Sequence, residues 1–267
     1  MLSLALLSML SATDPAQWLG PKPQLPVTRV VTLAPSLTET VIALGAAESL
    51  VGVSRFCEFP ETEKLPKTGG FNDLSVETIV ALKPQLVVVQ KAPANQKAVE
   101  TIARLGIPVL ALTLTTIDDV SVAMRELGRA LGRDEAAAKL VKALAEARAA
   151  AREVKSAKKK RVLFVYGFSP LVVAGPGSFA HELLEDCGAE NAAKKAPTAY
   201  PTYSMEKVVT LVPDVIVDAA DVKEGREALE KLAPMKKAKW VDLPTKDLLH
   251  PGPALAKALP TLCPLVR

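Results

Sequence analysis

The chain has few of the residues that bind metals or form redox sites. Its 267 residues include only two histidines, His181 and His250, and three cysteines, Cys57, Cys187 and Cys263. Two histidines exclude a multi-histidine metal centre, and the cysteines lack the CxxC and Cys/His spacings of zinc sites. We therefore expect no resident metal and no cofactor. In an exported protein, two of the cysteines could pair and leave the third free.

Motifs of nucleotide-binding proteins and hydrolases are also absent. The sequence has no phosphate loop, no GxSxG elbow, no HExxH helix and no GxGxxG turn after a strand. Its one glycine cluster, AGPGS at 174–178, fits neither nucleotide pattern and is interpreted as a turn. The sequence therefore predicts no catalytic residues and a protein that is not an enzyme. An α/β enzyme with a buried cofactor is kept as the weaker alternative.

Charge and hydropathy limit the partners and the location. A formal net charge of +4 is too small to suggest a nucleic-acid partner, and the one basic run, KSAKKKR at 155–161, lies where a long helix should end. The first residues, MLSLALLSMLSA, have an apolar core of signal-peptide length, although a disordered or packed N-terminal helix is the alternative. We predict export to the periplasm, with residues 1–26 as signal peptide and tether and Trp18–Pro26 as the tether itself.

Two segments of the chain repeat the same pattern. VETIVALKPQLVVV at 76–89 and MEKVVTLVPDVIV at 205–217 each place a glutamate and a short helical run before a proline and a valine-rich run. Proline ends a helix, and the apolar run has the length and composition of a strand buried on both faces. Glu77 and Glu206 are 129 residues apart, as are Pro84 and Pro213. A repeat of this length predicts two similar α/β lobes.

The apolar runs alternate with helical patterns, which predicts parallel sheets flanked by helices in both lobes. The expected strands are 30–33, 50–53, 86–90, 109–112, 162–166, 171–174, 214–218 and 240–243. Two helices are predicted between the lobes, at 118–131 and from Asp134 to about Lys155. The second contains neither glycine nor proline. We predict lobes at 27–117 and 159–267, joined across 118–158 by one long rigid helix that resists bending.

Candidate binding residues lie where the predicted strands end, because ligands of parallel α/β sheets bind beyond the carboxyl ends of the strands. In the first lobe these are Ala34, Pro35, Ser36, Arg55, Phe56, Phe71, Asn72 and Gln90. In the second lobe they are Tyr166, Phe168, Tyr200, Asp247 and His250. Aromatic residues are only 4% of the chain, and several fall at these positions. This favours an aromatic-walled cleft for a large flat ligand, with aromatic side chains of the core as the alternative.

These segments carry a resemblance to a known family. RVVTLAPSLTETVIALGAAESLVGVSRF at 29–56, ETIVALKPQLVVV at 77–89, LLEDCGAEN at 183–191 and the helical connector resemble the helical-backbone (class III) substrate-binding proteins of ABC importers. Family members bind cobalamin, heme or ferric siderophores, and the cobalamin-binding members are the most similar. The resemblance covers about 29–263 and implies a monomer that delivers a ligand to a dimeric import permease.

The resemblance also assigns roles to residues. The pocket wall of the cobalamin-binding members corresponds to seven of the candidate positions above: Ala34, Pro35, Ser36, Phe56, Phe71, Tyr166 and Tyr200. Phe71 and Tyr200 stand in place of tryptophans. Gln90 replaces another tryptophan, and His250 falls near a ligand-contacting arginine. Heme binders use axial Tyr, His or Met, so His250, Tyr166 or Tyr200 could serve there. A heme or a ferric siderophore is therefore the alternative ligand.

Two further features follow from the same resemblance. In this family a glutamate from each lobe pairs with arginines of the two permease subunits, and the matching positions are Glu77 and Glu206. Each could otherwise be a first-turn acid that favours the helix dipole. The resemblance also implies a disulfide between Cys187 and Cys263, with Cys57 free, because the cobalamin-binding members have cysteines at the first two positions.

Overall fold

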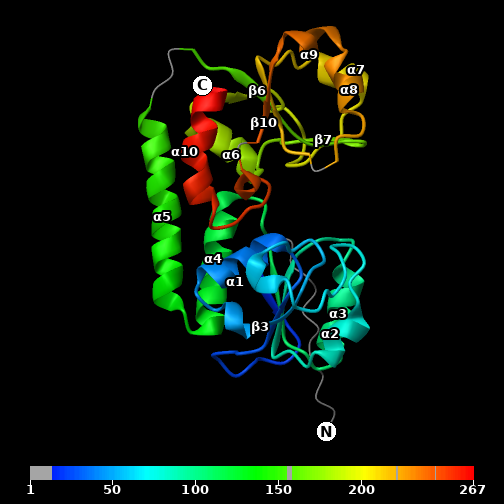
Figure 1. Ribbon diagram of the computed structural model, residues 1–267, viewed down its shortest axis with the longest axis vertical. Helices are drawn as coiled ribbons and strands as arrows, with labels where there is room; N and C mark the ends of the chain where they lie inside the picture. Colours follow the sequence, from blue (N-terminus) through cyan, green and yellow to red (C-terminus); the bar gives the residue numbers. More distant parts are fainter. Residues whose placement is uncertain (1–13, 155–157, 221, 244) are drawn as a thin grey trace. The chain divides into compact units, whose positions relative to one another are not determined.

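The computed structural model describes residues 14–154, 158–220, 222–243 and 245–267 (Figure 1). The chain forms two compact units. The first contains the residues up to Leu114 together with Asp118–Val141, and the second contains Thr115–Ile117 together with Lys142–Arg267. Each unit has its own largely parallel sheet flanked by helices, so the predicted α/β class is confirmed.

The sheet of the first unit has the strand order β1-β5-β4-β2-β3. Its strands are β1 (Ala16–Leu19), β2 (Val30–Thr32), β3 (Leu50–Val53), β4 (Leu86–Gln90) and β5 (Val109–Leu112). Strands β2 to β5 are parallel and lie where the apolar runs predict them. Their side chains are almost wholly buried, as expected for strands covered on both faces.

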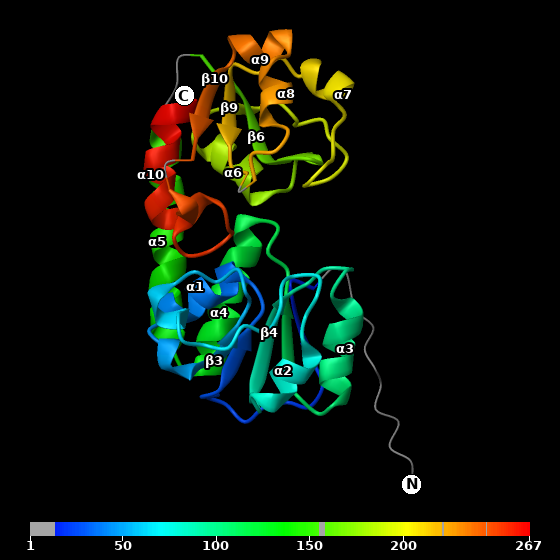
Figure 2. The same ribbon diagram turned by 45° about the vertical axis from the view of Figure 1, so that its right-hand side comes forward.

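Helices cover both faces of this sheet (Figure 2). They are α1 (Pro35–Ala43), α2 (Val76–Ala81), α3 (Gln96–Arg104) and α4 (Ile117–Leu131), with short 3-10 turns η1 (Ala47–Ser49) and η2 (Pro60–Thr62). Ile79 of α2 and Ile102 of α3 pack with Val31 and Val87 on one face. On the other face, Thr38 of α1 shares a 2.6 Å hydrogen bond with Thr32 of β2. Alternate residues of the strands thus face different helices.

The predicted tether over Trp18–Pro26 is wrong at its start. Ala16–Leu19 form β1, which pairs antiparallel with β5, so that Trp18 lies opposite Leu110. The three prolines that suggested an extended linker all follow Leu19 and leave the ladder uninterrupted. The predicted signal peptide lies in residues 1–13, outside the described residues, and stays a prediction.

The predicted long helix is present as α5 (Asp134–Glu153). Its residues divide between the units, with the part up to Val141 in the first unit and the part from Lys142 in the second. Helix α4 falls within the predicted connector at 118–158, but from Asp118 onward it belongs to the first unit. The stiffness of α5 stays a prediction, supported by a sequence without glycine or proline.

The second unit has the strand order β10-β9-β6-β7, with β8 paired to β6. Its strands are β6 (Arg161–Phe168), β7 (Leu171–Val173), β8 (Glu190–Asn191), β9 (Val215–Asp218) and β10 (Lys239–Asp242). Its helices are α6 (Phe179–Asp186), α7 (Met205–Val209), α8 (Arg226–Glu230), α9 (Ala233–Lys237), the 3-10 turn η3 (Lys246–Leu248) and α10 (Leu255–Val266). Strands β6, β9 and β10 are mutually parallel, so their carboxyl ends share one edge (Figure 2).

The sequence repeat is also a structural repeat. Ser75 caps α2 by accepting a hydrogen bond from the amide of Thr78 at 3.3 Å, and Ser204 caps α7 in the same way from Lys207 at 3.2 Å. The residue before each repeated proline has a left-handed backbone, with φ of 48° at Lys83 and 42° at Val212. In both units the chain leaves a short capped helix through a left-handed residue and enters a buried parallel strand.

The predicted disulfide between Cys187 and Cys263 is confirmed, with the two Cα atoms 4.9 Å apart. It joins the end of α6 to α10. The Arg267 side chain strengthens this junction by donating hydrogen bonds to the carbonyl oxygens of Cys187 at 2.9 Å and of Ala151 in α5 at 2.7 Å. Cys57 is free and buried, as expected, and its burial raises the pKa of the thiol.

Candidate functional site

The carboxyl end of β2 is the switch point of the first sheet. Strand β3 lies on one side of β2 and β4 on the other, the arrangement that opens a crevice beyond the strand ends. The predicted residues Ala34, Pro35 and Ser36 occupy this position and begin α1, whose N-terminus has no side-chain cap. Ala34 and Ser36 are buried and Pro35 is partly exposed, so this turn can shape the floor of a site.

Arg55 and Phe56, which follow β3, meet the loop before α2. The Arg55 guanidinium forms an ion pair with Asp73. The backbone amide of Arg55 donates a 2.9 Å hydrogen bond to the Gly69 carbonyl. The hydrogen bond from Arg55 holds the pKa of the Asp73 carboxyl below its usual range. Arg55 also lies 5.5 Å from the centre of the Phe56 ring, which is 58% exposed. The fold thus presents an aromatic face at this edge.

The other predicted residues of the first unit lie at the same strand edge. Phe71 is partly buried and Asn72 is exposed, both in the loop that Arg55 contacts. Gln90 ends β4 and is partly buried, and its backbone carbonyl accepts a 3.0 Å hydrogen bond from the side chain of buried Asn95. This bond ties the start of α3 to the end of β4.

In the second unit, two predicted tyrosines are in contact. The rings of Tyr166 in β6 and Tyr200 lie edge to face with their centres 5.6 Å apart. The Tyr166 hydroxyl is buried without a hydrogen-bond partner among the described residues, whereas the Tyr200 side chain is 40% exposed. Desolvation and the neighbouring Tyr200 raise the pKa of Tyr166 well above its usual range. The Tyr166 side chain is therefore protonated at neutral pH, with its hydroxyl enclosed by the protein.

The loop carrying Tyr200 is held against the AGPGS turn. The Gly175 amide donates a 2.8 Å hydrogen bond to the Ala199 carbonyl. A Cβ atom on Gly175 would come within 2.1 Å of the Thr198 carbonyl oxygen, so only glycine permits this approach. The turn thus positions the backbone next to Tyr200.

A hollow of about 180 Å³ adjoins Tyr166. The end of β6 forms one wall, and the segment after β9 forms the other; the lining residues are Tyr166, Gly167, Phe168, Ser169, Val222 and Glu224. Phe168, which we predicted to contact the ligand, is buried and packs 6.3 Å from the Trp240 ring. The Phe168 side chain therefore packs inside the wall of the hollow and presents little surface to a ligand.

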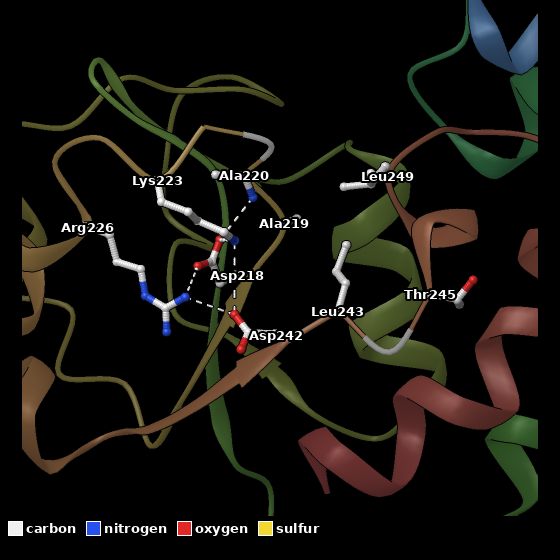
Figure 3. A pocket seen from close by; sticks show the side chains of 9 residues that line it. All are labelled: Asp218, Ala219, Ala220, Lys223, Arg226, Asp242, Leu243, Thr245 and Leu249. Carbon is white, nitrogen blue, oxygen red and sulfur yellow. Dashed lines mark hydrogen bonds and ion pairs between the residues drawn. The ribbon is translucent and has the colours of Figure 1, made fainter. Parts of the chain in front are cut away.

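A larger cavity of about 470 Å³ lies at the carboxyl ends of β9 and β10 (Figure 3). Its lining residues come from those ends and the loops that follow: Asp218, Ala219, Ala220, Lys223, Arg226, Asp242, Leu243, Thr245 and Leu249. None of these nine residues is among the binding residues predicted from the sequence. The available signal was an aspartate ending both strands, in VIVD and in KWVD. The predicted Asp247, exposed, and His250, partly buried, lie in the same loop as Thr245 and Leu249.

The two glutamates singled out by the repeat are exposed in the first turns of α2 and α7. Both follow the serine cap by two residues. Phe71 belongs to the first unit and Tyr200 to the second.

Within the described ranges, no group of three or more His, Cys, Asp or Glu side chains is placed to hold a metal ion. Among the same residues, none of the helices combines the length and apolarity needed to traverse a bilayer.

Known proteins resemble this chain in sequence and in structure. A vitamin B12-binding protein of Salmonella typhi is 33% identical over 198 residues, which are 73% of this chain and 74% of the relative. The periplasmic heme-binding protein RhuT of Roseiflexus sp. RS-1 has a TM-score of 0.76 at 27% identity, over 90% of this chain and 98% of that one. The molybdate-binding protein MolA of Haemophilus influenzae shares the fold, with a TM-score of 0.77 at 22% identity over 91% and 86%.

A family model, described as periplasmic binding protein, matches residues 30–234. These residues include strands β2 to β9 and the Tyr166–Tyr200 pair. The chain thus belongs to the periplasmic binding protein family and is a binding protein, not an enzyme.

Proposed function

We propose that the protein captures a cobalamin in the periplasm and delivers it to the permease of an ABC importer. The observation that carries this proposal is the relative from Salmonella typhi, described as a vitamin B12-binding protein, which matches nearly three quarters of the chain. The N-terminal apolar segment would direct export, in keeping with a family of periplasmic proteins. We expect the protein to act as a monomer.

The chemistry at the strand ends is consistent with a large ligand that has flat apolar faces. Phe56 and Tyr200 are large exposed aromatic side chains, one in each unit, and such rings bind apolar faces with little loss of side-chain entropy. Tyr166 packs edge to face against Tyr200 and thus supports the exposed ring from within the second unit. A corrin ring, with its apolar faces, matches these aromatic side chains.

Heme is the second candidate, because RhuT is a heme-binding protein with 27% identity to this chain. A heme needs an axial ligand, and tyrosine binds ferric iron as phenolate. The raised pKa of Tyr166 disfavours its phenolate. His250 and the exposed Tyr200 are therefore the side chains that this alternative requires.

Titration with cyanocobalamin, haemin and a ferric hydroxamate, followed by calorimetry and absorbance, tests the proposal. We expect saturable binding of cyanocobalamin at one site per chain. Haemin binding with a sharp Soret band that His250→Ala or Tyr200→Phe abolishes, together with no response to cyanocobalamin, would instead establish the heme alternative.

We further propose that Glu77 and Glu206 dock the protein on the two permease subunits. Their positions under the 129-residue repeat would present one carboxylate to each half of a two-fold partner. Removing an interface charge weakens recognition and leaves the ligand site untouched. Glu77→Gln and Glu206→Gln should therefore slow cobalamin transport by the reconstituted permease without changing ligand affinity. Glu135→Gln, which removes another exposed first-turn carboxylate, is the matched control.

A further inference from the structure

The cavity at the ends of β9 and β10 is large enough for part of a ligand. Its volume of about 470 Å³ falls within the roughly 300–1,000 Å³ typical of small-molecule sites. It lies at the edge of the parallel sheet where ligands of such folds bind. Asp218 and Asp242 are neighbours across the ladder, so both strands deliver a carboxylate to the same place.

The charges in this cavity form a closed network. The buried Asp218 carboxylate accepts from Arg226 Nη1 at 2.7 Å, from Lys223 Nζ at 2.8 Å and from the Ala220 amide at 3.0 Å. Arg226 Nη1 also donates to Asp242 at 2.9 Å, and Lys223 lies 4.0 Å from the same carboxylate. Each cation is therefore already neutralised by an aspartate.

The environment of Arg226 keeps the guanidinium in this position. Its Nε donates to Glu230 at 2.7 Å, and its central carbon lies 5.1 Å from the centre of the Trp240 ring. Glu230 therefore adds a further negative charge next to Arg226. The described lining residues thus offer an incoming anion no surplus of positive charge.

The opposite side of the cavity is mainly apolar and also carries the hydroxyl of Thr245. Figure 3 shows the charged side chains gathered on one side, with Leu243 and Leu249 on the other. Asp242 remains 71% exposed and Lys223 48% exposed, so both keep hydrogen-bonding capacity toward the cavity. A primary amide carries two donors and one acceptor, which match a carboxylate and an ammonium placed side by side. A carboxylate in the same position would face the Asp242 and Asp218 carboxylates, whose charges already balance those of Lys223 and Arg226.

From these observations we propose that this cavity is a subsite for a neutral, amide-bearing edge of the ligand, and that Asp242 excludes carboxylates from it. The inference deepens the proposed function and rests on it for the identity of the ligand, because corrins carry amide side chains where heme carries two carboxylates. The Asp218–Arg226 pair would position Asp242 and Lys223, whose free lone pairs and hydrogens bind the amide.

Cyanocobalamin and its monocarboxylic acid derivatives, in which one side-chain amide is a carboxylate, test the subsite by calorimetry. Like charges juxtaposed in an interface are strongly unfavourable, so we expect at least one acid isomer to bind the wild type on the order of tenfold more weakly than cyanocobalamin. Asp242→Asn removes the repelling charge and frees a donor of Arg226, and it should abolish most of this difference. Glu227→Gln removes a carboxylate of α8 that pairs with Lys231 outside the cavity, and it should leave the difference unchanged.

The outcomes separate the subsite from the function. If cyanocobalamin binds and every acid isomer binds equally well, the subsite is refuted and the proposed function stands. If Asp242→Asn leaves the discrimination intact, the role of Asp242 is wrong. If haemin binds and cyanocobalamin does not, the proposed function fails. A wild-type protein that then prefers haemin to its dimethyl ester would overturn the subsite as well.

Discussion

The contact of α5 with α6 in the second unit depends on one buried carboxylate. Asp186, with its side chain 2% exposed, accepts hydrogen bonds from Arg148 Nε and Arg152 Nε, each at 2.5 Å. Arg148 is 17% exposed and also contacts Glu182 at 3.2 Å, whereas Arg152 is 58% exposed. Asp186 thus ties the second half of α5 to the helix that ends in the disulfide.

The exposure of the partners sets the expected cost of losing this charge. Breaking a fully buried ion pair by removing one partner costs about 3–5 kcal/mol. The ion pair with Arg152 contributes little to the free energy of unfolding because Arg152 is solvated, and exposed pairs contribute about 1 kcal/mol or less. Arg148 keeps Glu182, and an asparagine oxygen can still accept one of the hydrogen bonds. We therefore expect Asp186→Asn to lower the free energy of unfolding of the second unit by about 2 kcal/mol.

Urea unfolding measures this effect if the two units are observed separately. The two tryptophans, Trp18 in β1 and Trp240 in β10, lie in different units. In a Trp18→Phe background, fluorescence of Trp240 therefore reports on the second unit alone. Glu182→Gln, which changes a carboxylate that is 23% exposed and contacts Arg148 alone in this network, is the matched control and should cost less than Asp186→Asn. An Asp186→Asn variant within 0.5 kcal/mol of its parent would refute the reasoning, since that would leave the buried charge without a net contribution.

Three further predictions concern the backbone and Tyr166. Val212, 56% exposed and β-branched, has a left-handed backbone, so Val212→Gly should raise the free energy of unfolding in urea by about 0.5–1 kcal/mol; a lower stability would contradict the strain. Gly175→Ala should displace the Thr198 carbonyl, lowering stability by about 1–3 kcal/mol and weakening ligand binding through Tyr200; wild-type behaviour in calorimetry and thermal unfolding would disprove the close approach. Because the folded state raises the pKa of Tyr166, its contribution to stability is complete below about pH 10 and is lost as the pH rises through the folded pKa. The alkaline absorbance difference between wild type and Tyr166→Phe should appear only above about pH 10, and its appearance near neutral pH would contradict the burial of the hydroxyl.

Local patterns in the sequence were sufficient for the repeated architecture. Valine-rich runs after Pro84 and Pro213 predict buried parallel strands, because period and residue type are properties of a short segment. The same holds for the alanine-rich α5, which has no helix breaker. The pairing of Cys187 with Cys263 required the resemblance to a family, since spacing alone left the partner of each cysteine open.

The features that sequence reasoning missed depend on contacts between distant segments. Strand β1 forms because it pairs antiparallel with β5. Nothing in the short AQWL segment specifies that partner. The closed network joins Asp218 and Arg226 to Asp242, which comes from the next strand.

The sequence by itself therefore determined two α/β units, most of their strands and the helix α5, whose residues divide between them. Only the tertiary structure decided which polar groups share a cavity and which are neutralised. Helix and strand periods are set by neighbouring residues, whereas charge balance and desolvation at Asp218 are set by side chains that meet only when β9 and β10 align in register.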